Sequence, residues 1–330
     1  MAFDCVYASA SWGLHDLRWT NALRELGHEP AIVVLDRDAD AASFHDHVAA
    51  AAHGSLPVLA GPLTTVTRLL TAGPDLPRVV GLSWGFDLHQ LQQEQDVAWL
   101  ATLSGLIVDS EPTRRIALES GMRKEQLTYL PWGVDLEQFN PAVEPMDLTS
   151  LGLRADARVV LSLRAHEPLY RVGEIIEAFA LAHAEQDDLV LLVGHSGSLT
   201  RSFQAQVARL KLDEAVLFID SVEEPQVARL LRAASCYVTA AEVDGTSVTL
   251  LQAMACGTPV VASDSPGNLD WISPVTGYLF HMGSITQLHA ALVQAMSSDT
   301  SRRTDAALAL VRARADWHAN LHRLHDALFD

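Results

Sequence analysis

The chain has 330 residues, of which 49% are hydrophobic and 19% are charged, and its formal net charge is −18. This length exceeds that of one typical domain, so two domains with sizeable apolar cores are expected. The acidic balance argues against nucleic acid or an anionic membrane as the main partner, because both require basic surface. The three cysteines, Cys5, Cys236 and Cys256, are scattered, which indicates a reducing compartment and no thiolate metal site.

The N-terminal segment MAFDCVYASASWG lacks a basic region and a long apolar run, so no signal peptide is expected. No segment has the length of uncharged apolar sequence that a bilayer span needs. These patterns predict a soluble, cytoplasmic protein.

Apolar runs alternate with helical patterns in the first half of the chain, which is typical of α/β folds with parallel sheets. Strands are predicted at 5–9, 30–36, 79–85 and 105–110, and helices at 17–27 and 112–121. The prolines in LTYLPWGVDLEQFNPAV then break this alternation, so residues 127–143 are predicted to connect two domains.

The same alternation restarts in the second half. Strands are predicted at 157–164, 188–197, 215–222, 236–241 and 260–264, and helices at 172–185, 198–211, 225–234, 285–296 and 301–329. The chain is therefore predicted to form two doubly wound α/β domains facing each other across a cleft, with ligands at the carboxyl ends of the strands.

The stretch DGTSVTLLQAMACGTPVVASD, residues 244–264, places small polar residues at the start of an apolar helix and a buried strand after it. Such a helix start presents unpaired backbone N–H groups, which suit a negatively charged ligand. This stretch therefore predicts an anion site.

Three segments of the sequence resemble glycosyltransferase family 4, the retaining group also described as glycosyl transferases group 1. They are VDSEPTRRIALESGM…LTYLPWGVDLEQFNP, LSLRAHEPLYRVGEIIEAF and DGTSVTLLQAMACGTPVVASDSPGNLDWI. The resemblance implies a GT-B fold with two Rossmann-like domains. Residues 1–140, with a C-terminal helix at about 315–330 crossing back, would form the acceptor domain, and residues 150–314 would bind a nucleotide-sugar donor.

The family carries one glutamate that contacts the donor sugar and a second that contacts the ribose hydroxyls. The matching positions here are Asp244 and Gln252, so both glutamates are replaced. Asp244 keeps a carboxylate with a shorter reach, and Gln252 keeps a hydrogen-bonding group without charge. Alternatively, Asp244 only caps the helix and Gln252 is solvated. Gly245, Thr246 and Ser247 would bring backbone N–H groups to the donor diphosphate.

Arg164 matches the arginine of the family's phosphate clamp. The companion lysine of the family is replaced by Tyr170 or Arg171, and we favour Arg171 because a diphosphate requires positive charge. Arg171 could equally bind a surface carboxylate. Gly194 resembles the glycine turn after the next strand, and Val222 lies where the family contacts the nucleobase through its backbone.

Two loops of the first domain would face the acceptor according to the resemblance. Trp12, Gly13 and His15 lie in one loop, and Trp84 and Asp87 in the other. Asp87 is a candidate for a polar contact to the sugar or acceptor, and His15 could orient the acceptor hydroxyl. Both could instead be ordinary loop residues. Arg164, Asp244 and Asp87 are thus the expected catalytic residues.

His318, His322 and His325 recur on one helical face, but no acidic or thiolate residue at matching spacing favours a metal site. Retaining enzymes of this family require neither a catalytic triad nor a metal, so no cofactor is expected. The resemblance implies a displacement on the same face of the sugar, with the leaving phosphate helping to deprotonate the acceptor.

The sequence thus predicts a retaining glycosyltransferase that uses a nucleoside-diphosphate sugar. The alternatives are a nucleotide-sugar-binding partner that has lost transfer, and a GT-B epimerase or phosphorylase. Residues 1–140 contain nine Lys or Arg against 18 Asp or Glu, so no basic patch for an anionic lipid is evident. We expect a soluble acceptor, namely a saccharide, a small metabolite or an aglycone; an acidic domain would also suit a cationic acceptor.

Overall fold

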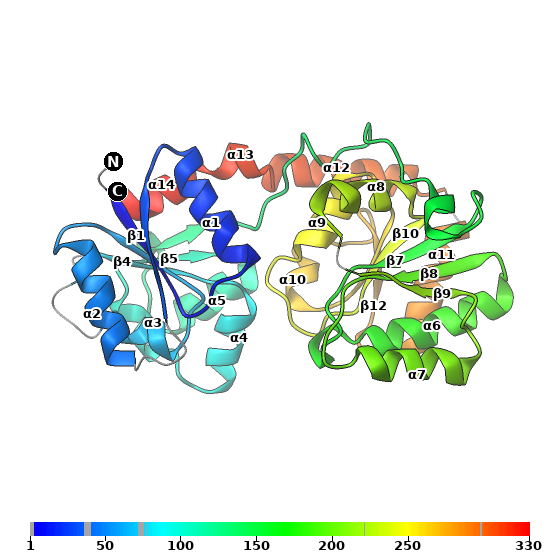
Figure 1. Cartoon of the computed structure of the whole chain (residues 1–330), viewed down its shortest axis with the longest axis horizontal. Helices are drawn as coiled ribbons and strands as arrows, with labels where there is room; N and C mark the ends of the chain where they lie inside the picture. The colour runs from blue at the N-terminus through cyan, green and yellow to red at the C-terminus, as the bar shows by residue number, and fades with distance from the viewer. Residues whose placement is uncertain (1–2, 36–40, 72–75, 77, 221, 298) are drawn as a thin grey trace. The chain divides into compact units, whose positions relative to one another are not determined.

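The chain divides into two compact units in the computed structural model (Figure 1), which describes residues 3–35, 41–71, 76, 78–220, 222–297 and 299–330. Unit 1 combines residues 1–131 with 318–330, and unit 2 consists of residues 132–317. The boundary lies inside the predicted connection 127–143, whose first residues instead complete the sheet of unit 1 as strand β6 (Leu127–Tyr129).

Unit 1 contains a six-stranded parallel sheet in the order β2-β1-β3-β4-β5-β6. Its strands are β1 (Cys5–Ser9), β2 (Pro30–Val34), β3 (Val58–Ala60), β4 (Val79–Leu82), β5 (Gly105–Val108) and β6. Its helices before the boundary are α1 (Leu14–Glu25), α2 (Ala41–Ala52), α3 (Thr65–Leu69), α4 (Phe86–Gln93) and α5 (Glu111–Glu119), with short 3-10 turns at Ala98–Thr102 and Lys124–Gln126.

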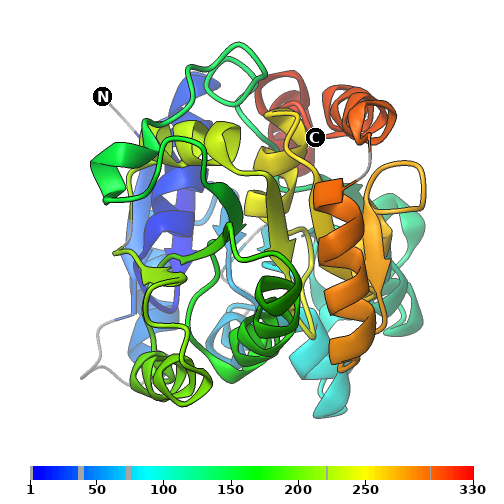
Figure 2. The ribbon, with the colours of Figure 1, turned by 90° about the vertical axis from the view of Figure 1, so that its right-hand side faces the viewer.

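Unit 2 repeats this architecture with the parallel order β12-β11-β10-β7-β8-β9 (Figure 2). Its strands are β7 (Arg158–Ser162), β8 (Leu189–Val193), β9 (Val216–Phe218), β10 (Cys236–Thr239), β11 (Val260–Ser263) and β12 (Tyr278–Phe280). Its helices are α6 (Val172–Glu185), α7 (Thr200–Leu210), α8 (Glu224–Ala233), α9 (Val248–Ala255), α10 (Pro266–Leu269), α11 (Ile285–Ser297) and α12 (Ser301–Arg314), with 3-10 turns at Leu148–Leu151 and Pro168–Tyr170.

Helices cover both faces of the sheet in unit 2, which explains its continuously apolar strands. Side chains alternate between the faces along a strand. In β7, Val160 packs in the core under α6 and α11, whereas Val159 and Leu161 pack in the core under α8, α9 and α12. The prediction of two doubly wound α/β domains is therefore confirmed.

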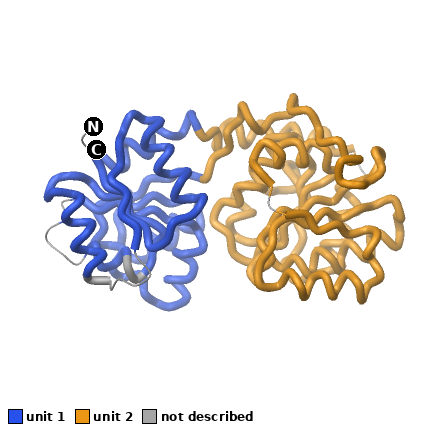
Figure 3. Tube along the Cα trace, in the orientation of Figure 1, with its two compact units in different colours: residues 1–131, 318–330 blue, residues 132–317 orange. Residues whose placement is uncertain are grey.

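The predicted helix at 301–329 is interrupted and forms α12, α13 (Trp317–Asn320) and α14 (His322–Phe329). The interruption follows from pairing with the segment after the unit boundary. Val134 donates its N–H to the carbonyl of Ala315 at 2.7 Å and accepts from the N–H of Trp317 at 3.0 Å. Beyond this point, α14 packs against β5 and β6, so residues 318–330 group with unit 1 (Figure 3).

None of the helices in the described ranges combines the length and the apolar character required to span a bilayer.

The loop between β10 and α9 is packed tightly against the first turn of α10. Because β10 and β11 are neighbouring parallel strands, the segments that follow them meet at the same edge of the sheet. A Cβ atom on Gly267 would lie 2.0 Å from the carbonyl oxygen of Gly245 and 2.2 Å from that of Asp244. Only glycine permits this approach, which fixes the backbone of the loop.

We expect Gly267→Ala to lower the free energy of unfolding by about 2–3 kcal/mol, because the loop backbone must move to admit the methyl group. Chemical denaturation of the purified variant measures this. Gly105→Ala is the control, since a Cβ there would meet its nearest neighbour at 3.5 Å. Equal stability of both variants and the wild type would contradict the packing argument.

Candidate functional site

The strand order of unit 2 reverses direction between β7 and β10. The first strand of the unit, β7, lies between β8 and β10, so the chain leaves it toward one side and returns on the other. Ligands of doubly wound sheets bind at this switch point, outside the carboxyl ends of the strands. Arg164 follows β7 here, and Asp244 lies in the segment that follows β10.

Arg164 is held from three sides. Its Nη2 donates to Oδ2 of Asp244 at 2.7 Å, and its Nη1 donates to Oγ of Ser247 at 2.8 Å. The guanidinium carbon lies 4.1 Å from the ring centroid of Tyr170, a cation–π arrangement. Arg164 is only 8% exposed. Burial alone would lower the pKa of this guanidinium, but the charge and hydrogen bond of Asp244, together with the electrostatic effect of Tyr237 and Tyr170, offset the burial, and the pKa is raised above its ordinary value. Arg164 is therefore a buried and oriented cation.

The N-terminus of α9 lies beside this cation. Ser247 is the N-cap residue of the helix, but its hydroxyl makes no capping hydrogen bond and accepts from Arg164 instead. Gly245 and Thr246 precede it and are buried. The positive end of the helix dipole and the guanidinium thus reinforce each other, as an anion site requires.

The other residues predicted to contact the donor, Gln252, Gly194 and Val222, lie in different environments. Gln252 lies on α9 and is buried. Gly194 follows β8 and donates its N–H to the carbonyl of Ser162; a Cβ on it would lie 2.5 Å from Leu163, so packing already requires glycine there. Val222 is half-buried and packs against the apolar core beside α8 and α9.

The structure brings Tyr170, rather than the favoured Arg171, into contact with Arg164. Arg171 has a left-handed backbone, with φ of 49°, and its Nε donates to Glu174 at 2.7 Å. Its Nη1 donates to Glu242 at 3.2 Å. The alternative of an arginine that binds carboxylates is thus the arrangement in this structure, and the role of Arg171 in phosphate binding stays a prediction.

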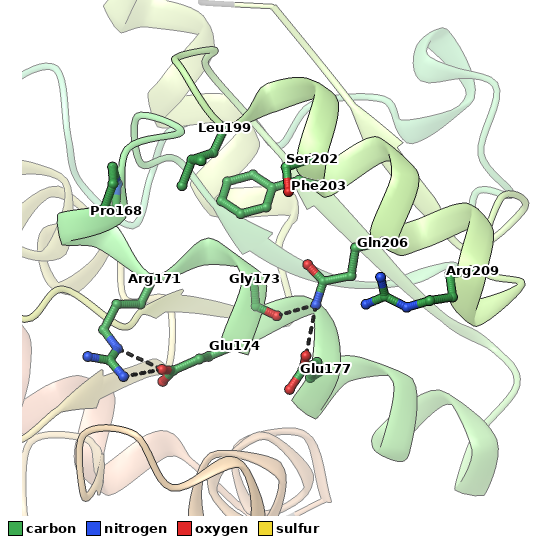
Figure 4. Close-up of a pocket in the computed structure, with 10 residues that line it drawn as sticks. All are labelled: Pro168, Arg171, Gly173, Glu174, Glu177, Leu199, Ser202, Phe203, Gln206 and Arg209. Carbon is green, nitrogen blue, oxygen red and sulfur yellow. Dashed lines mark hydrogen bonds and ion pairs between the residues drawn. The ribbon is translucent and has the colours of Figure 1, made fainter.

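Arg171 lines a cavity of about 420 Å³ between α6 and α7 (Figure 4). Gln206 crosses this cavity and donates to the carbonyl of Gly173 and to Glu177. The cavity contains none of the residues that hold Arg164.

His195 is a residue of this edge that the sequence analysis did not single out. It follows Gly194 at the end of β8, next to β7, and has a left-handed backbone with φ of 69°. Desolvation and the positive charge of Arg164 lower the pKa of His195 below its ordinary value. The sequence did contain a signal for His195. It lies near the end of the predicted strand 188–197, and this strand pairs with β7, which precedes Arg164.

In unit 1, the predicted loops after β1 and β4 meet through aromatic rings. The rings of His15 and Trp84 lie 5.0 Å apart in an edge-to-face arrangement. Trp12 lies edge-on to Tyr7, with 6.4 Å between the ring centroids. Gly13 is the N-cap residue of α1 and donates its N–H to Asp16.

Exposed apolar residues that were not predicted as site residues lie close to these aromatic residues in the sequence. Leu14 is 83% exposed, and Leu17 and Phe86 are also exposed. Leu14 and Leu17 lie three residues apart in the first turns of α1, so they share one face of that helix. The signal was the position of Leu14 between the predicted loop residues Gly13 and His15, and of Leu17 two residues after His15.

The structure buries Asp87, which is 3% exposed. Its carboxylate accepts hydrogen bonds from the backbone N–H groups of Leu63, Trp84 and Leu88 and from the hydroxyl of Ser83. Burial raises the pKa of Asp87 despite these donors. Asp87 therefore ties the loops after β3 and β4 together, and its contact with the sugar or acceptor stays a prediction.

Two of the C-terminal histidines contact side chains of their own unit, and His322 contacts the backbone carbonyl of Ala319. His318 pairs with Glu25, and Nδ1 of His325 lies 2.9 Å from Nε2 of His28. Across the described ranges, no group of three or more His, Cys, Asp or Glu side chains is arranged to hold a metal ion.

Residues 146–309 match the model of the family described as Glycosyl transferases group 1. The match lies entirely within unit 2, so the family resemblance is established for that unit. Among curated relatives, the chain is 30% identical over 212 residues to a D-inositol 3-phosphate glycosyltransferase of Thermobispora bispora, covering 61% of this chain and 49% of the relative. It is 26% identical over 202 residues to a GDP-mannose-dependent monoacylated alpha-(1-6)-phosphatidylinositol monomannoside mannosyltransferase of Corynebacterium glutamicum, covering 57% and 52%. The chain spans about half the length of these curated relatives.

Two solved structures show the same fold over nearly the whole chain. Anabaena HepE in complex with UDP and glucose superimposes with a TM-score of 0.81 at 16% identity and covers 99% of each chain. Sucrose-phosphate synthase of Thermosynechococcus elongatus superimposes with a TM-score of 0.79 at 19% identity and covers 98% of each chain. The predicted GT-B fold is therefore confirmed.

We expect Asp87→Ala to destabilise unit 1 by about 3 kcal/mol or more, because it leaves several buried N–H groups without an acceptor. The affinity of unit 2 for nucleotides should stay at the wild-type value. Thermal and urea denaturation, with nucleotide titrations, measure both. A variant of wild-type stability that had lost acceptor turnover would support the predicted contact of Asp87 with the acceptor.

Proposed function

We propose that this chain transfers a sugar from a nucleoside diphosphate to an acceptor hydroxyl, with the donor diphosphate bound at the carboxyl ends of β7 and β10. The observation that carries this proposal is the buried guanidinium of Arg164 beside the N-terminus of α9. Charge-assisted hydrogen bonds from arginine and helix N–H groups are the usual partners of phosphate oxygens. Structures of Anabaena HepE with UDP and with UDP-glucose support the same donor class.

The proposed reaction proceeds with retention, as in the family that the sequence resembles. The bond between the anomeric carbon and the phosphate oxygen breaks, and the acceptor oxygen bonds to the same face of the sugar. The acceptor proton passes to the departing phosphate. Negative charge then builds on the diphosphate, where Arg164 and the first N–H groups of α9 stabilise it. Gln252 is the proposed partner of the ribose hydroxyls, and no metal or further cofactor takes part.

For the acceptor, we propose a saccharide or small aglycone that packs on the aromatic loops of unit 1. Trp12, Leu14, Leu17 and Phe86 are exposed and Trp84 is half-buried in the segments that follow β1 and β4. Aromatic faces bind sugar rings and flat aglycones through apolar contact, and exposed apolar surface of this kind marks binding sites. Curated relatives are named for lipid and small-molecule acceptors, among them diacylglycerol, inositol phosphate and malate derivatives.

We expect Arg164→Ala to weaken binding of UDP or GDP by about 10- to 100-fold, the value of a charge-assisted hydrogen bond in a buried site. Isothermal titration of UDP, GDP, ADP and dTDP with wild type and variant measures this. Arg158→Ala is the matched control, because Arg158 contacts Gln186 and Asp188 where β7 begins, at the opposite edge of the same sheet. Undiminished binding by Arg164→Ala would contradict the donor site. Donor binding without turnover on any acceptor would instead favour a binding partner that has lost transfer.

We expect Trp84→Ala and Trp12→Ala to raise KM for the acceptor by about tenfold. Each variant removes aromatic surface that the bound acceptor would bury, and burial of apolar surface stabilises the complex. The affinity for the donor nucleotide should not change. Steady-state kinetics with varied acceptor and fixed donor separate the two effects. Phe3→Ala is the control, since Phe3 is exposed near the start of β1, at the other edge of the sheet. Equal KM values in all variants would exclude these loops from acceptor binding.

A further inference from the structure

The carboxylate of Asp244 is committed to Arg164 before any donor arrives. Oδ2 of Asp244 accepts from Nη2 of Arg164 at 2.7 Å, and the two side chains are 18% and 9% exposed. The backbone of Asp244 cannot shift freely, because Gly267 packs directly against its carbonyl oxygen. An aspartate side chain is also one methylene shorter than the glutamate of the family pattern. The fixed backbone and the shorter side chain therefore both limit how far the carboxylate of Asp244 can reach toward a donor sugar.

The pair leaves Arg164 able to bind a phosphate. A guanidinium carries five N–H groups in one plane, and the hydrogen bonds of Arg164 to Asp244 and Ser247 use different nitrogens. Asp244 and Ser247 with the ring of Tyr170 fix that plane. The remaining donors thus point in a set direction without an entropic cost at binding.

The same pair also reduces the charge that a diphosphate meets. Arg164 with Asp244 is neutral as a unit, so part of the attraction between Arg164 and the phosphate oxygens is opposed by the carboxylate. A site of this kind binds a diphosphate in one orientation but does not retain it strongly, which favours release of the nucleotide product.

We propose that Asp244 is a positioning residue that orients Arg164 for the donor diphosphate and moderates its charge, and that it does not contact the donor sugar. This inference rests on the proposed function of the site. It differs from the role expected from the family resemblance, in which the residue at this position contacts the sugar.

The test compares Asp244→Asn with the wild type by isothermal titration of UDP, GDP, UDP-glucose and GDP-mannose at low salt. Asparagine keeps the shape and can still accept from Arg164 through its carbonyl oxygen, but it carries no charge. We expect the nucleoside diphosphate and its sugar conjugate to bind more tightly by the same factor, about 5- to 30-fold, the effect of one carboxylate charge several ångströms away in a partly screened site. The gain should shrink in high salt.

Two further variants separate orientation from charge. Asp244→Ala also removes the charge but leaves Arg164 without its acceptor, so it should bind nucleotides more weakly than Asp244→Asn. Asp188→Asn removes the same charge from an arginine–aspartate pair at the opposite edge of the sheet, where Asp188 lies 3.4 Å from Arg158. It should bind nucleotides as the wild type does. Circular dichroism checks that each variant is folded.

Three other outcomes would overturn the inference. If Asp244→Asn weakened only the sugar conjugates, Asp244 would contact the sugar, and the proposed function would stand. If it weakened nucleotide and conjugate alike, the carboxylate charge would be required for binding, and the proposed function would again stand. If neither wild type nor variant bound any of the four probes, the inference and the donor site would fail together.

Discussion

Parallel strands that are buried on both faces must all end at the same edge of their sheet, and this constraint determines where chemistry can occur in each unit. In unit 2 the strand order reverses between β7 and β10, so the segments after these strands meet although about 80 residues of sequence separate them. Arg164, Ser247 and Asp244 come together for this reason alone. The packing of Gly267 against the same loop then fixes its backbone.

The charge balance at this edge would allow a strongly acidic chain to bind the proposed anionic donor. A net charge of −18 repels a diphosphate at long range, but solvent and salt screen that repulsion over about 8–10 Å. The buried guanidinium of Arg164 and the first turn of α9 act at contact distance, where screening is weak. Local geometry, and not net charge, therefore decides which ligand this site accepts.

Much of the fold could be predicted from the sequence because its helices and longer strands repeat clear patterns. The predicted helix 172–185 coincides with α6, whose apolar residues recur on one face. Strands β3 and β6 were missed, because three residues are too few to show a period, and helices α2, α3 and α4 were not predicted either. The interruption of the helix 301–329 depends on the pairing of Val134 with residues far along the chain, which no local pattern reveals.

The candidate site was predictable to a similar extent. The block 244–264 and Arg164 could be found from their types and spacing, because a helix start and an arginine after a strand have one common use in such sheets. The choice between Tyr170 and Arg171 depended on a left-handed turn at Arg171, and the burial of Asp87 depended on donors from two loops. Such tertiary contacts determine which polar side chains remain available to a ligand.

The most direct test of the central claim is a crystal structure of the chain with UDP or GDP, whichever binds more tightly. The account predicts that the diphosphate contacts Arg164 and the first N–H groups of α9, with Asp244 still paired to Arg164 and away from the sugar position. A diphosphate bound elsewhere, for example by Arg171 in the cavity between α6 and α7, would contradict it.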